Sequence, residues 1–158
     1  MRGPVPIAEV VSSHPLLAGL PGEAVAEVAG CARNVAFGAG ALLLAEGDPA
    51  DLLYLVRRGQ VAIEIHTPER GTIVIETVGP GAVVGWSWLL PPYRWHFDAR
   101  ATEPVGAVAV DGACLRAKAD SDPALGYALM KRVSALLLDR LQSTRLRLLD
   151  LYGTTGGR

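Results

Sequence analysis

The feature that most constrains the fold is a series of short β-prone segments separated by glycine-containing turns. The segments cover residues 34–37, 41–45, 52–57, 60–66 and 72–78, and a further one covers residues 105–110. The turns between them contain Gly38, Gly40, Gly47-Asp48-Pro49, Gly59 and Gly71. Turn signals at roughly eight- to twelve-residue spacing are typical of an antiparallel sandwich or barrel. We therefore expect a mainly β domain.

Helical patterns flank this β region on both sides. Residues 21–32 carry apolar residues at helical spacing and follow a small turn that begins at His14, whereas residues 1–13 predict only a loose N-terminal arm. Residues 122–152 predict a long helix of about 45 Å, because Asp122 suits an N-cap and Pro123 suits the first helical position. The domain organisation that follows is an arm (1–13), a β domain with flanking helices (14–121), a C-terminal helix (122–152) and a tail (153–158).

The long helix has two apolar stripes, although a helix that packs only on its own domain needs one. The first stripe, which we assign to a dimer interface, contains Leu129, Val133, Leu136, Leu137, Leu141 and Leu148. Met130, Leu138, Leu149 and Tyr152 follow a neighbouring face. The surplus predicts a second helix from another copy of the chain, and hence a homodimer. The alternative is that the second stripe covers the N-terminal helix.

The composition is that of a globular domain and excludes several classes of protein. The net charge is −1, so there is no general electrostatic attraction to nucleic acid. Cys31 and Cys114 stand alone in the sequence, which favours two reduced core thiols in a cytosolic protein. No apolar run approaches the length of a membrane-spanning helix, and the N-terminus lacks a signal-peptide pattern. We expect a cytoplasmic protein with no membrane contact.

One stretch, residues 79–104, concentrates the aromatic residues, including all three tryptophans, Trp86, Trp88 and Trp95. Its second half, residues 94–101, alternates polar and apolar side chains, which predicts a strand with two chemically different faces. Its first half runs from a Gly-x-Gly turn to Pro91-Pro92 and predicts a single helical turn.

The text of residues 38–65, GAGALLLAEGDPADLLYLVRRGQVAIEI, closely resembles the opening of the cyclic nucleotide-binding domain of the catabolite activator (Crp/Fnr) superfamily. The matching residues are Gly40, Glu46-Gly47-Asp48, Ala50-Asp51, Leu53-Tyr54, Gly59 and Val61. The resemblance runs from about residue 14 to residue 152. It implies a double-stranded, jelly-roll-like β-roll with flanking helices, a ligand pocket inside the roll and a long C-terminal dimerisation helix.

In that family a phosphate-binding cassette forms the pocket, and the resemblance places the cassette in the aromatic stretch. The residues at cassette positions, which we take as candidate ligand-binding residues, are Gly85, Trp86, Ser87, Trp88, Leu89, Arg94, Trp95 and His96. Gly85 and Leu89 keep the family pattern. Trp86 stands at the glutamate position and Trp95 at the arginine position, with Arg94 one residue earlier. An indole donates one hydrogen bond and accepts none, so Trp86 cannot replace a carboxylate.

These departures leave three interpretations of the ligand. The aromatics fill the pocket and leave a structural interaction module, or they stack on a planar ligand while Arg94 or His96 meets an anion, or cyclic AMP or cyclic GMP still binds. Family transcription factors continue into a helix-turn-helix domain, which this sequence does not contain. We therefore expect a ligand-sensing regulator that acts through a partner protein rather than by binding DNA itself.

An enzyme of the cupin type, which shares the outline of the roll, needs several ligands that converge on one metal ion. The histidines, His14, His66 and His96, lie in separate segments. His96 and Asp98 would point the same way on a strand, but an exposed polar face with Arg94 and Arg100 as counter-charges explains them better, and Ser87 has no neighbouring base. We expect no catalytic residue, no metal site and no cofactor.

Overall fold

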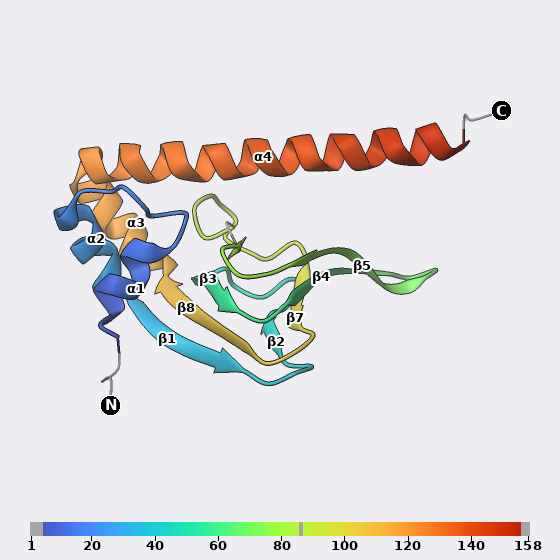
Figure 1. Cartoon of the computed structure of the whole chain (residues 1–158), viewed down its shortest axis with the longest axis horizontal. Coiled ribbons are helices and arrows are strands. Elements are labelled where there is room, and N and C mark those ends of the chain that lie inside the picture. The colour runs from blue at the N-terminus through green and yellow to red at the C-terminus, as the bar shows by residue number, and fades with distance from the viewer. Residues whose placement is uncertain (1–4, 86, 156–158) are drawn as a thin grey trace.

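A computed structural model describes residues 5–85 and 87–155 of the chain. Figure 1 shows helices gathered at one end of a β-roll and one long helix, α4, lying across the whole molecule. The helices are α1 (Ile7–Ser13), α2 (Gly22–Ala29), α3 (Gly112–Ser121) and α4 (Pro123–Thr155). The strands are β1 (Ala32–Phe37), β2 (Leu42–Leu44), β3 (Leu52–Arg58), β4 (Val61–Thr67), β5 (Gly71–Val78), β6 (Val83–Val84), β7 (Asp98–Ala101) and β8 (Val105–Asp111).

The strands form two antiparallel sheets of four strands each, in the orders β1-β8-β3-β6 and β2-β7-β4-β5. This arrangement confirms the predicted mainly β fold with flanking helices, a double-stranded β-roll with a long C-terminal helix. The alternation along β3 shows how the two sheets use their faces: Tyr54 and Val56 lie inside the roll, while Leu53 and Leu55 pack against the helices. The molecule therefore has one core between its sheets and a second core between a sheet and the helices.

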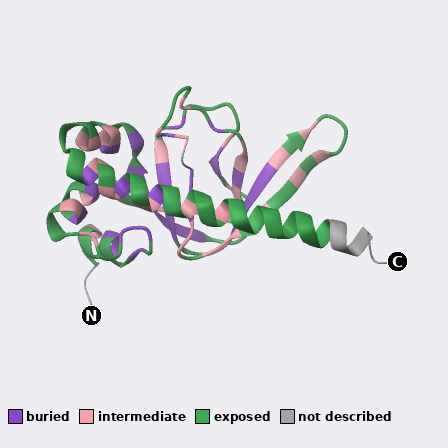
Figure 2. Cartoon of the chain, turned by 90° about the horizontal axis from the view of Figure 1, so that it is seen from above, coloured by how far each residue is buried: buried purple, intermediate pink, exposed green. Residues whose placement is uncertain are grey.

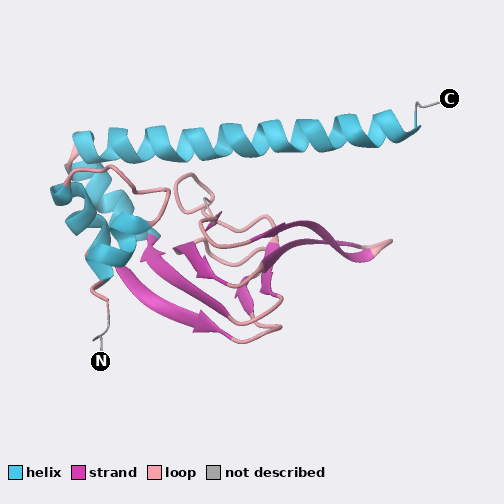
Figure 3. Ribbon diagram, in the orientation of Figure 1, coloured by secondary structure: helices cyan, strands magenta, loops and turns pink. Residues whose placement is uncertain are grey.

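Two helices were not anticipated. The sequence predicts a loose arm over residues 1–13, whereas α1 places Val10 and Val11 in the helix-side core, where they are 5% and 0% exposed. The sequence also predicts only a turn at Asp111-Gly112, whereas α3 begins there, with the Asp111 carboxylate accepting a hydrogen bond from the Cys114 N–H (2.9 Å). Figure 3 shows α1, α2 and α3 together at the same end of the roll.

The cysteines differ from expectation as well. Cys31 and Cys114 form a disulfide with a Cα–Cα distance of 5.7 Å. The prediction of two reduced thiols is wrong for this structure, because β1 and β8 pair side by side and bring the two residues together at the same edge. Their separation of 83 residues in sequence gave no sign of this contact.

The long helix has one inward face along its first half. Leu129 and Val133 are each 6% exposed. Leu129 belongs to the helix-side core, and Leu136 packs against that core. Figure 2 shows this change along α4, with buried positions in the first half and mostly exposed ones in the second. The helix continues to Thr155, three residues beyond the predicted end at residue 152.

Candidate functional site

Trp95 fills the space in front of Gly85, where the resemblance places the start of the cassette. Gly85 has a φ of +92°, and a Cβ atom added there would stand 2.5 Å from Cη2 of Trp95. Trp95 is 5% exposed and packs in the core of the roll. Only glycine fits beneath this indole, because any side chain at position 85 meets both the ring and an unfavourable backbone conformation.

The backbone on either side of Trp95 is held against the 47–50 loop. The Trp95 N–H donates to the Asp48 carbonyl (3.1 Å), and the Trp95 carbonyl accepts from the Gly47 N–H (3.0 Å). Consecutive residues of an extended segment point to opposite sides, so the inward Trp95 leaves Arg94 and His96 exposed. The alternation predicted over residues 94–101 is therefore present, although regular strand β7 covers only its second half.

Arg94 does not point into the roll. Its Nη1 donates to the Gly47 carbonyl (2.8 Å), which fixes the guanidinium on the outer side of the loop. An arginine one residue before the family position thus lies on the wrong face to meet a phosphate beside Gly85. The side chains of Arg94 and His96 are exposed, whereas Gly85 and the Trp95 ring are buried, so the structure does not gather these four predicted residues in one site.

A cavity of about 260 Å³ lies beside Trp95. Most of its lining residues are apolar or aromatic, and two are aspartates: Leu43, Leu44, Ala45, Asp48, Pro49, Asp51, Leu52, Tyr54 and Trp95. Among these lining residues none carries a positive charge. Burial raises the pKa of the Tyr54 phenol, opposed in part by the charge of Arg33, so Tyr54 is a neutral aromatic wall. The cavity favours a planar ligand that is uncharged or cationic over an anion.

Trp88 lies in a different core from Trp95. It is 3% exposed and packs among the helix-side core residues, with Gly112 so close that an added Cβ would stand 2.7 Å from Cβ of Trp88. The Nε1 atom of Trp88 is buried without a hydrogen-bond partner. The expected helical turn over this segment is a run of turns in the described residues, and Trp86 lies outside them. Ser87 and Leu89 are half-buried.

Helix α3 lies between α4 and the described residues at cassette positions, 85 and 87–96, which we call the cassette segment. Arg116 donates to the Trp88 carbonyl, and its guanidinium stacks over the Tyr93 ring at 4.3 Å from the centroid. A second cavity, of about 280 Å³, opens between this segment and α4 and is lined in part by Leu89, Asp120 and Met130. The contact between Arg116 and Tyr93 has no signal in the sequence, because the helix that positions Arg116 is not predicted.

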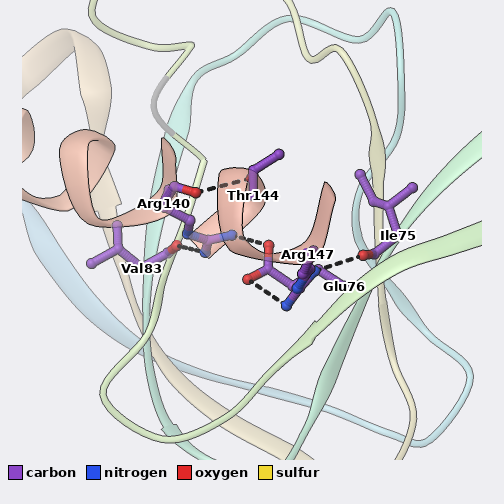
Figure 4. A network of polar contacts seen from close by, with 6 residues as sticks. All are labelled: Ile75, Glu76, Val83, Arg140, Thr144 and Arg147. Atoms are coloured by element: carbon purple, nitrogen blue, oxygen red, sulfur yellow. Dashed lines mark hydrogen bonds and ion pairs between the residues drawn. The ribbon is translucent and has the colours of Figure 1, made fainter. Parts of the chain in front are cut away.

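The second half of α4 is attached to the roll by arginines. Figure 4 shows Arg140 and Arg147 both contacting the Glu76 carboxylate on β5, with an Arg147 to Glu76 distance of 3.8 Å. Arg147 also donates to the Ile75 carbonyl (3.0 Å), and nearer the start of the helix Arg132 donates to the Leu16 carbonyl (2.9 Å). From the sequence, the basic residues of this helix are expected to form a solvated face: Lys131, Arg132, Arg140, Arg145 and Arg147. Arg132, Arg140 and Arg147 instead hold the helix on its own chain.

The remaining leucines predicted for the dimer interface face outward. Leu137, Leu141 and Leu148 are 45%, 47% and 50% exposed. They belong to a row of exposed positions at alternating spacings of four and three, which we call the exposed seam: Met130, Ser134, Leu137, Leu141, Thr144 and Leu148. This spacing is the heptad pattern of a coiled-coil interface.

His14 is buried where the turn between α1 and α2 meets the segment before β6. It is 6% exposed, and its Nδ1 accepts a hydrogen bond from the Leu16 N–H (3.1 Å). Burial lowers the pKa of His14 below its ordinary 6.5, while the Ala82 carbonyl opposes this to a smaller extent. The imidazole is therefore held in its neutral form in the folded protein.

We predict that this histidine weakens the fold in mild acid. Its folded pKa lies below its unfolded pKa, so the unfolded chain binds the proton first, and stability present above about pH 6.5 falls as the pH drops through that value. Urea unfolding at pH 7.5 and 5.5 should show a loss that is smaller in His14→Gln and unchanged in His66→Gln. Equal losses in all three proteins would refute the assignment.

The described residues contain no group of three or more His, Cys, Asp or Glu side chains placed to hold a metal ion. The suggested pair of His96 and Asp98 is not arranged as an acid and a base, because Asp98 accepts a hydrogen bond from the Glu46 N–H (2.6 Å) and His96 is exposed. In the part of the chain that the structure describes, no helix combines the length and hydropathy needed to span a bilayer.

Comparisons with known proteins agree with this architecture. A family model described as the cyclic nucleotide-binding domain matches residues 34–122. The chain is 27% identical over 146 residues to the CRP-like cAMP-activated global transcriptional regulator of Mycobacterium tuberculosis (strain CDC 1551 / Oshkosh). That match covers 92% of this chain and 63% of the regulator, so the chain spans less than two thirds of its relative.

Solved structures show the same likeness. A protein of Geobacter metallireducens GS-15, solved as a cyclic nucleotide-binding protein, is 33% identical with a TM-score of 0.76, over 85% of this chain and 97% of that one. The catabolite activator protein of Thermus thermophilus is 25% identical with a TM-score of 0.69, over 87% of this chain and 63% of that one.

Proposed function

Since the chain belongs to the cyclic nucleotide-binding domain family, we propose that it is a non-enzymatic sensor module whose ligand is a small planar molecule other than a cyclic nucleotide. The observation that carries the proposal is the position of Trp95, which packs over Gly85 and leaves a cavity of about 260 Å³ beside it. A relative named as cAMP-activated gives the fold a sensing role. Trp95 changes what is sensed.

Electrostatics argue against the usual ligand. A cyclic phosphate carries a negative charge and needs a cation or several N–H donors at close range. The cavity lining offers two carboxylates, Asp48 and Asp51, and the nearest arginine of the cassette segment, Arg94, donates to Gly47 on the outer side. An aromatic ligand that is uncharged or positively charged would stack on Trp95 without an unpaired anion.

We also propose that the module works as a homodimer joined along the exposed seam. The seam places apolar side chains at heptad spacing on the side of α4 that its own chain leaves uncovered. A ligand that enters beside Trp95 would shift the cassette segment and with it Trp88, whose carbonyl accepts a hydrogen bond from Arg116. Through Arg116 the shift would reach α3, and from α3 it would reach α4. A partner protein would then bind the changed dimer with a different affinity.

Ligand binding is tested by tryptophan fluorescence and calorimetry. Cyclic AMP and cyclic GMP should give dissociation constants weaker than about 1 mM, whereas adenosine or phenethylamine, which lack the phosphate charge, should bind more tightly than either. Asp51→Asn should weaken phenethylamine and leave adenosine nearly unchanged, which makes it a matched control for charge. Micromolar binding of cyclic AMP would refute the proposal.

The second candidate is a structural interaction module with a plugged pocket, favoured by the burial of Trp95 at 5% exposure. It predicts a flat response to every compound in the titration and no small molecule released when the purified protein is denatured. Native mass spectrometry separates the two functions, because a sensor should carry or acquire a bound molecule and a plugged module should not.

A further inference from the structure

The disulfide between Cys31 and Cys114 joins two elements that the rest of the structure holds together only by weaker contacts. Cys31 lies between α2 and β1, and Cys114 lies in the first turn of α3. The same junction carries a backbone hydrogen bond from the Asp111 N–H to the Cys31 carbonyl (2.8 Å). The bond therefore fixes the start of α3 to the edge of the roll.

Helix α3 is in a position to transmit changes at this bond. Near the end of α3, Nζ of Lys118 donates to the backbone carbonyl of Glu27 on α2 (2.8 Å) and lies 3.4 Å from the Glu27 carboxylate. Arg116 in the middle of α3 binds the Trp88 carbonyl and stacks on Tyr93. Only Asp122 separates the last residue of α3 from the first residue of α4. A shift of α3 would thus reach both the cassette segment and the long helix.

The sulfurs border a space that a small reagent can enter. A cavity of about 290 Å³ is lined by Gly30, Cys31, Ala32, Arg33, Leu52, Ala109, Asp111 and Cys114. Cys114 is half-buried, while Cys31 is only 8% exposed. Arg33 lines the same cavity as Cys114, which lies in the first turn of α3. A nearby cation and a helix N-terminus favour a thiolate, whereas the Asp111 carboxylate that caps α3 opposes them.

The fold does not depend on this bond in the way that small disulfide-rich domains do. A chain of 158 residues can bury a substantial core, and this one has one core inside the roll and another under the helices. We expect these two cores to keep the chain folded when the bond is open.

We propose that Cys31 and Cys114 are a reversible thiol–disulfide site that exchanges with low-molecular-weight thiols and disulfides of the glutathione type. In the oxidising direction the Cys114 thiolate attacks one sulfur of the small disulfide, forms a mixed disulfide and releases one small thiolate. The Cys31 thiol then loses its proton and attacks the Cys114 sulfur, which closes the protein bond and expels the second small thiolate. The protein loses two electrons, the small disulfide gains them, and two small thiols leave.

The reduced form has α3 held by hydrogen bonds and packing alone. Its amides should then open more often, because the covalent link to the α2–β1 junction is gone. The β4–β5 hairpin lies in the other sheet from β1 and β8, the strands next to the two cysteines, and serves as an internal reference. The site is thus a second input to the same helix that the cassette segment contacts.

The test uses the full chain in native buffer with reduced and oxidised glutathione. Alkylation and mass spectrometry should find no reactive thiol in the oxidised protein and both cysteines reactive in the reduced one, with full return on reoxidation. Amide exchange in α3 should be about tenfold or more faster after reduction, with the β4–β5 hairpin unchanged. A bond that opens only after denaturation, or α3 exchange that ignores reduction, would overturn the proposal.

Single variants test the order of attack. With oxidised glutathione, Cys31→Ser should accumulate a mixed disulfide on Cys114, and Cys114→Ser should form much less, because Cys31 is more buried. The double variant should show the α3 exchange of the reduced protein and no response to thiols. Faster modification of Cys31 would overturn the assigned order. None of these readouts involves a ligand of the roll, so they fail or succeed independently of the sensor function.

Discussion

Replacing Trp95 with alanine is expected to lower the free energy of unfolding by about 3–5 kcal/mol, the usual cost of truncating a large buried aromatic side chain. Trp95 is 5% exposed, and its ring packs in the core between the two sheets. The indole is too large for its neighbours to close over the space it leaves. Urea unfolding followed by circular dichroism measures the change, and a loss below about 1 kcal/mol would show that Trp95 is not a core residue.

Two controls separate core packing from local backbone effects. Arg94→Ala should change stability by less than about 1 kcal/mol, because the exposed guanidinium gives up one hydrogen bond to Gly47. Gly85→Ala should be strongly destabilising in the native background, since the new Cβ would stand 2.5 Å from the Trp95 ring at a φ of +92°.

The double variant identifies the contact itself. In the Trp95→Ala background the ring is absent, so Gly85→Ala should retain only the cost of the positive φ. The two changes should therefore be less than additive, with a coupling of about 0.5–3 kcal/mol. Strict additivity would mean that Trp95 does not lie over Gly85, and the argument against a cyclic phosphate at this position would lose its basis.

The roll could be predicted from the sequence because its signals are local. Glycines at the turns mark strand ends, and the alternation from Arg94 to Ala101 places Trp95 inside and Arg94 outside. The family resemblance then predicts that the cassette lies in this stretch. The same local reasoning did not predict β6, a strand of two residues, because so short a segment has no period to detect.

The candidate site was harder to predict because its contacts are long-range. The disulfide joins residues 83 positions apart. Arg116 contacts the Trp88 carbonyl from a helix whose first residues, Asp111-Gly112, predict a turn in the sequence. The cavity beside Trp95 takes Asp48 and Asp51 from the loop that matched the family, but only folding places that loop against Trp95. Spacing in sequence carries no information about such contacts.

The long helix shows how a correct pattern can be divided wrongly. The sequence shows two apolar stripes and predicts Leu129 and Val133 in the contact with a partner, yet both side chains are buried within the single chain, at 6% exposure each. On a helix of 3.6 residues per turn, the inward stripe and the exposed seam are neighbours, and residues at their border fit either. Burial separates them: Met130, Leu137, Leu141 and Leu148 remain exposed.

Leu141→Glu is expected to turn the proposed dimer into a monomer at micromolar concentration. Leu141 stands in the middle of the exposed seam and is 47% exposed in the single chain. In a two-helix interface, the carboxylate introduced by Leu141→Glu would face the same position of the partner helix or a neighbouring leucine, without a counter-charge. We expect the dissociation constant to rise by at least about 100-fold, or roughly 2.7 kcal/mol.

Leu146→Glu is the matched control, because Leu146 is 63% exposed and lies five positions further, about 140° around the helix from Leu141. Sedimentation equilibrium should show a dimer for the native chain and for Leu146→Glu, and a monomer for Leu141→Glu. At protein concentrations low enough to dissociate the dimer, all three should unfold at similar urea concentrations, since neither leucine packs in its own chain's core. A native chain that is monomeric, or two variants that dissociate equally, would contradict the seam, and a ligand signal would then have to leave the module through α3 without a second copy.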